Sequence, residues 1–110
     1  MGNIDFASIT SQIVDAFKVN LSKNWKEIKP YAEKEAKAFT ENLKLIAELK
    51  LSGKIDEETA RLHVEIQKNS MRIVLLTIKG LSILTVENAI NAALAIIRTA
   101  VNAAIGWPVL

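Results

Sequence analysis

The sequence predicts an all-α protein in which residues 1–110 form a single domain. The expected architecture is an antiparallel helical hairpin or four-helix bundle, with a long apolar C-terminal helix that self-associates. Three observations predict it. Four glycines and two prolines are too few for a protein of strands and turns. Half of the residues are apolar and 24% are charged, so the chain can bury a core. Apolar residues also recur at intervals of three and four, which is the helical spacing.

The first half of the chain predicts two amphipathic helices. A helix over about residues 4–22 has apolar residues at every fourth position: Ile9, Ile13, Phe17 and Leu21. A second helix is expected over 25–51, with Ala32, Ala36, Phe39, Leu43 and Ile46 facing inward. Its outer face alternates in charge, which is typical of a solvated surface: Lys26, Glu33, Lys37, Glu41, Lys44 and Glu48.

Three positions predict how these helices begin and end. Asn24 and Glu27 have the spacing of a capping box at the start of the second helix. Pro30 predicts a kink or a later start. Gly53 is expected to end this helix in the left-handed conformation, and Asp56 to cap the next one. Because the loop between them is short, the flanking helices are expected to be antiparallel neighbours.

The second half of the chain carries a long run of apolar residues at intervals of three and four. The run comprises Leu62, Ile66, Asn69, Ile73, Leu76, Gly80, Ile83, Glu87, Ile90, Leu94, Ile97, Val101 and Ala104. Two architectures accommodate it. Either Gly80 separates helices over 56–79 and 82–105, with Ser82 as the second cap, or residues 56–105 form one continuous helix. The sequence leaves both open, since a glycine inside a helix costs only about 1 kcal/mol.

Residues 73–105 are apolar on nearly every face, which predicts that they are covered on several sides. We therefore expect a homo-oligomer whose interface contains Ile83, Glu87, Ile90, Ala93, Leu94, Ile97, Arg98 and Val101. If two copies cross antiparallel, Glu87 would lie opposite the partner's Arg98. The alternative is that both charged side chains point to solvent.

No residue pattern indicates enzymatic chemistry. The chain has no cysteine. The single histidine, His63, has Thr59, Ala60, Ile66 and Gln67 at the positions where a helical metal site needs a second ligand. The glycines are scattered, so they form no phosphate-binding loop. We expect no catalytic, cofactor-binding or metal-binding residues.

The charge pattern also argues against a nucleic-acid partner. The formal net charge is only +2. The densest group of lysines, over residues 23–34, is interleaved with glutamates that cancel the field phosphate binding requires. The expected partner is therefore the protein itself or another apolar helix.

The expected function is that of a non-enzymatic structural or adaptor protein. The N-terminal residues lack the pattern of a secretion signal, so a cytoplasmic location is expected. The alternative is a membrane-inserting protein with residues 80–105 as the span, because Gly80–Ile97 contains one charge in 18 residues. Glu87 opposes this alternative, since a charge at the bilayer centre costs about 2.5–3.5 kcal/mol. A ligand-binding bundle, a third class, would need an internal cavity.

Overall fold

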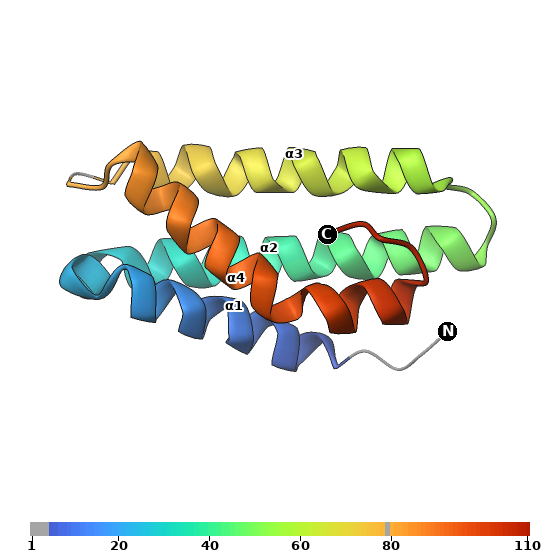
Figure 1. Ribbon diagram of the computed structural model, residues 1–110, viewed down its shortest axis with the longest axis horizontal. Coiled ribbons are helices and arrows are strands. Elements are labelled where there is room, and N and C mark those ends of the chain that lie inside the picture. Colours follow the sequence, from blue (N-terminus) through green and yellow to red (C-terminus); the bar gives the residue numbers. More distant parts are fainter. Residues whose placement is uncertain (1–4, 79) are drawn as a thin grey trace.

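The computed structural model describes residues 5–78 and 80–110, and it confirms the all-α class (Figure 1). Four helices pack in contact to form a helical bundle. They are α1 (Phe6–Asn20), α2 (Trp25–Leu51), α3 (Glu57–Leu76) and α4 (Ile83–Ile105), with a short 3-10 helix, η1 (Ser22–Asn24), between α1 and α2. The described ranges contain no strand.

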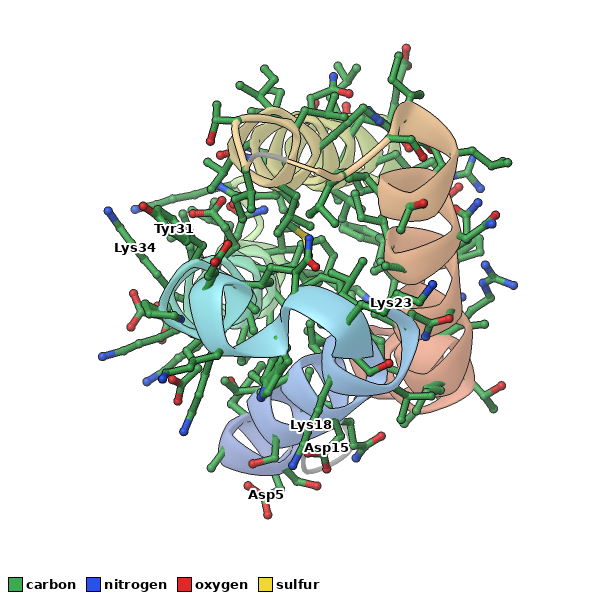
Figure 2. The ribbon with its side chains drawn as sticks, turned by 90° about the vertical axis from the view of Figure 1, so that its left-hand side faces the viewer. Asp5, Asp15, Lys18, Lys23, Tyr31 and Lys34 are labelled. Carbon is green, nitrogen blue, oxygen red and sulfur yellow. The ribbon has the colours of Figure 1, made fainter. Side chains whose placement is uncertain are left out.

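Successive helices run in opposite directions, and the fourth returns to the first (Figure 1). α4 begins beside the end of α3 and crosses obliquely until it lies along α1. Figure 2 shows the same arrangement from the end of the bundle, with α4 running between the level of α3 and that of α1. As a result, α3 contacts α2 along its length, whereas it contacts α4 mainly at one end.

The core contains the apolar residues that helical spacing predicted for the first half. All four residues of the predicted α1 stripe and all five of the predicted inward α2 positions are buried. The six alternating charges of the α2 outer face are exposed. Labelled side chains such as Tyr31 and Lys34 project from α2 away from the other helices (Figure 2).

Helix ends confirm two predicted caps and contradict a third. The carboxylate of Asp56 accepts a bond from the Thr59 N–H at 2.7 Å, and the Ser82 hydroxyl accepts one from the Thr85 N–H at 3.1 Å. Asn24 makes no side-chain capping bond, so the predicted capping box is wrong. Its φ of −118° and ψ of 19° differ from the extended conformation that aims an N-cap side chain at the helix.

Pro30 lies inside α2, which begins five residues earlier at Trp25, so of the two predicted outcomes, a kink or a later start, the later start is wrong. The chain turns from α1 through η1 into α2, so this turn is complete before Pro30.

The long apolar run is divided between two helices, which excludes the single continuous helix. α3 ends at Leu76, earlier than predicted, and α4 begins at Ile83. Gly80 has a φ of +93°, a left-handed conformation that an α-helix does not accommodate. This turn allows α4 to fold back onto α1. Lys79 lies outside the described residues.

The C-terminal segment after α4 is held against the end of the bundle where α2 ends and α3 begins. The Lys50 ammonium of α2 donates to the Ile105 carbonyl and lies 4.6 Å from the centre of the Trp107 ring. The Arg61 side chain donates to the Pro108 carbonyl at 3.2 Å, and Val109 is buried. These contacts place residues 107–110 against α2 and the first turns of α3.

Candidate interaction surface

Most of the residues predicted to form an interface between copies lie in the core of the single chain. Ile90, Ala93, Leu94, Ile97 and Val101 are all buried. α4 presents this face to α1 and to the rest of the bundle, so the chain itself supplies several of the sides that cover it. An interface between intact bundles therefore has to use other side chains.

The remaining three predicted interface residues are accessible: Ile83 and Glu87 lie one turn apart at the start of α4, and Arg98 lies about three turns farther along it. Ile83, in the first turn of α4, is 67% exposed. Arg98 is exposed. Glu87 is half-buried and pairs with Arg72 of α3 in the same chain, through Oε1 to Nε and through Oε2 to Nη2 at 3.3 Å.

The pair of Arg72 and Glu87 ties the end of α3 to the start of α4. The hydrogen bond from Arg72 lowers the pKa of Glu87 and outweighs the opposing effect of burial. Arg72 also donates to the side-chain oxygen of Asn69 one turn earlier. The guanidinium is thus held in place by α3 and α4 together.

α3 has two apolar faces, and only one of them lies in the core. Its core face consists of Ala60, Val64, Met71 and Leu75, all buried. Three further apolar side chains, Leu62, Ile66 and Ile73, are 57%, 63% and 64% exposed. Each follows a core residue by two positions, which is about 200° around a helix of 3.6 residues per turn. We call these three side chains the outer face of α3. The helix itself forms one edge of the bundle (Figure 1).

Two more exposed apolar side chains lie in the first turn of α4. Ile83 and Leu84 are 67% and 70% exposed, and they follow directly after the turn that ends α3. In the described part of the chain, six of the ten exposed large apolar side chains lie beyond Asp56: Leu62, Ile66, Ile73, Ile83, Leu84 and Ile96. Unpartnered apolar side chains are thus concentrated in the C-terminal half.

Sequence reasoning missed the outer face as a separate feature. It assigned Leu62, Ile66 and Ile73 to one continuous seam with the α4 residues. The signal was present, because a second apolar series two positions earlier (Ala60, Val64, Met71 and Leu75) already occupies the opposite side of the same helix. α2 and α4 cover the series that faces the core, and the other series is exposed to solvent.

Two polar side chains, Glu35 and Thr40, are buried in the part of the chain that the structure describes. Glu35 is buried and accepts a bond from the Ser70 hydroxyl at 3.3 Å. Thr40 bonds to Thr10 at 2.8 Å and to the Ala36 carbonyl. Among residues 5–78 and 80–110, no group of three His, Asp or Glu side chains is placed to hold a metal ion. The contacts of Glu35 with Ser70 and of Thr10 with Thr40 join neighbouring helices.

A surface hollow of about 410 Å³ lies between η1 and the start of α4. Asn20, Lys23, Asn24 and Thr85 contribute its polar lining, together with Ser22 and backbone at Gly80. Lys23 is the only titratable side chain in this lining, and no carboxylate or imidazole lies beside it there.

α4 has the length and composition of a membrane span: 23 residues, predominantly apolar. Of its most apolar 18-residue window, 44% is buried inside the bundle. The core helix of a water-soluble bundle meets the same criteria, so this property alone is weak support for insertion.

Fold and surface together define an all-α helical bundle with an unpartnered apolar helix face. No protein-family model, no curated protein and no solved structure matches this chain.

Proposed function

We propose that this protein is a non-enzymatic helical structural or adaptor protein that self-associates through its C-terminal half. The outer face of α3 carries the proposal. Contiguous exposed apolar side chains on a soluble protein mark interaction sites, whereas isolated ones need no explanation. Leu62, Ile66 and Ile73 are more than half exposed on one helix face, with Asn69 on the turn between the two isoleucines.

The rest of the chain supports association over chemistry. The side chains that reach across helices, such as Glu35 with Ser70 and Glu87 with Arg72, fasten the bundle together. Removing an apolar side chain from water contributes roughly 25 cal/mol per Å², so covering the outer face of α3 is favourable. A small bundle that presents such a face on a rigid helix is suited to assembly.

The test is the oligomeric state of the intact chain, measured by light scattering from micromolar to millimolar concentration. We expect a dimer or larger oligomer that Ile66→Gln combined with Ile73→Gln converts to a monomer, because glutamine keeps the helix but not the apolar surface. The matched control is Val19→Gln combined with Leu45→Gln, which removes exposed apolar side chains from α1 and α2. Monomeric wild-type protein at millimolar concentration would refute the proposal.

The second candidate function is membrane insertion, which the length and apolar composition of α4 favour. It requires α4 to leave the bundle and expose Ile90, Ile97 and the other side chains that it buries. Flotation with phospholipid vesicles separates the two candidates. Protein that floats with the vesicles and resists alkaline extraction supports insertion, and protein that stays in the aqueous fraction excludes it.

A further inference from the structure

We propose that the outer face of α3 binds the same face of a second copy of this chain, with the two helices antiparallel about a two-fold axis. This inference rests on the proposed self-association and specifies its partner, orientation and register. Three features support it: the charge distribution along α3, the spacing of the apolar side chains, and the position of Arg72.

The two halves of α3 carry opposite charge. Residues 57–66 contain three glutamates and one arginine, which makes a net charge of −2. Residues 67–76 contain Lys68 and Arg72, a net charge of +2. When two copies lie antiparallel, each acidic half faces a basic half, whereas parallel copies place like charges together. The helix dipoles also oppose each other in the antiparallel arrangement.

The apolar side chains set the possible registers. Leu62, Ile66, Asn69 and Ile73 are spaced by four, three and four residues, as in the seam of a coiled coil. In one antiparallel register Leu62 lies opposite the partner's Ile73, and Ile66 opposite the partner's Asn69. The two-fold axis repeats both contacts, so each large apolar residue of the outer face is covered.

The flanking charges select this register. Glu65 and Arg72 occupy equivalent positions on one side of the seam, seven residues apart. In the proposed register Glu65 lies beside the partner's Arg72, twice by symmetry. Sliding one helix by seven residues would bring Arg72 against the partner's Arg72 or Glu65 against the partner's Glu65. Such flanking pairs set orientation and partner choice in coiled coils.

Arg72 has unused hydrogen-bond donors for this second contact, and its side chain is already fixed in place. Three of its five N–H donors are used within the chain, by Glu87 and Asn69, so two remain. The Arg72 side chain is 28% exposed, and its guanidinium is already held by its partners on α3 and α4. A side chain fixed in advance loses little conformational entropy when it binds another carboxylate.

Disulfide cross-linking tests the orientation and register of the two helices. Because the chain has no cysteine of its own, only the introduced cysteines can form a disulfide. Leu62→Cys and Ile73→Cys are prepared as separate proteins, one carrying an affinity tag so that the three cross-linked dimers differ in size. After mixing and mild oxidation, we expect the mixed dimer as the dominant product. Either protein alone should cross-link poorly, because its two cysteines would lie about 16 Å apart along the helix axis.

Two further variants complete the experiment. Val19→Cys mixed with Leu45→Cys is the control for random collision, since both positions are exposed on other helices. Glu65→Lys should weaken dimerisation about tenfold, since two equivalent pairs are lost. The matched reversal Glu41→Lys, on the outer face of α2, should leave dimerisation unchanged.

The outcomes separate this inference from the proposed function. If light scattering finds a dimer but each cysteine variant cross-links with itself, the helices are parallel and this inference falls. A dimer that gives no cross-link, or no more than the control pair, means that another surface forms the interface. A monomeric wild-type protein would refute both this inference and the proposed function.

Discussion

The carboxylate of Glu87 lies against the guanidinium of Arg72 on the neighbouring helix, and this contact makes part of the bundle's stability depend on pH. The hydrogen bond from Arg72 lowers the pKa of Glu87 below its ordinary value of 4.5. A group whose pKa is lower in the folded state contributes stability above its unfolded-state pKa. That contribution is lost as the pH falls through the folded-state pKa.

We therefore expect Glu87→Gln to lower the free energy of unfolding at neutral pH by about 0.2–1 kcal/mol, the range for ion pairs that solvent reaches. Below the folded-state pKa the variant and the wild type should converge. Urea unfolding across this pH range measures the difference. Glu41→Gln, exposed on the outer face of α2, is the control. A Glu87→Gln deficit that persists unchanged in acid would show that the ion pair is not its cause.

At the scale of an element, the helices depend on turns that only glycine adopts easily. Gly53 and Gly106 both have positive φ, 70° and 88°, but their surroundings differ. A Cβ at Gly53 meets no atom within 4 Å, whereas one at Gly106 would lie 2.5 Å from the Lys50 ammonium. That ammonium holds the Ile105 carbonyl and lies over Trp107, so displacing it would loosen the end of α4.

Gly53→Ala should therefore cost only the strain of a left-handed alanine, about 1 kcal/mol. Gly106→Ala should cost clearly more, because it adds the displacement of Lys50 to the same strain. Thermal unfolding of both variants beside the wild type checks the order. Equal losses at the two positions would mean that the Lys50 contacts contribute little to stability.

Neighbouring isoleucines on α4 allow a second test at this scale. Ile97 is fully buried, whereas Ile96 is 56% exposed. Ile97→Ala should lower the stability of the bundle by about 2–5 kcal/mol through lost burial and a cavity. Ile96→Ala should change it by no more than about 0.5 kcal/mol. Denaturant unfolding of both variants measures this; similar losses would mean that α4 packs by a different face.

For the whole molecule, the proposed self-association would make stability depend on protein concentration. Anything that binds only the folded chain stabilises it, and in an oligomer that partner is the chain itself. The thermal midpoint of the wild type should therefore rise with protein concentration. For the variant that combines Ile66→Gln and Ile73→Gln it should stay constant. Wild-type midpoints that do not move between micromolar and millimolar concentration would contradict the proposed function.

The elements could be predicted from the sequence because helices depend on residues a few positions apart. The spacing of Ile9, Ile13 and Phe17 was enough to predict which face of α1 is buried. The caps at Asp56 and Ser82 lie three residues from the N–H groups that they satisfy. Asn24 had the right spacing for a cap but not the backbone conformation, which η1 sets.

The candidate interaction surface could be predicted only in part. Surplus apolar residues in the C-terminal half were evident, but their division between core and surface depends on which helices meet. Ile90, Ile97 and Val101 are covered because α4 folds back on α1, roughly eighty residues earlier in the chain. Leu62, Ile66 and Ile73 have the same spacing, yet they are exposed because α2 and α4 lie on the other side of α3.

Composition and spacing were thus sufficient for the helical class, the amphipathic faces and most helix ends, because hydrogen bonds and side-chain contacts within a helix join near neighbours in the chain. The tertiary structure decided where the long apolar run breaks, which half of it is buried, and that Glu87 pairs with Arg72. Those outcomes depend on the turn at Gly80 and the oblique crossing of α4, which bring together residues that local sequence does not relate. Which of several equally apolar helix faces is buried depends on how the helices pack against one another.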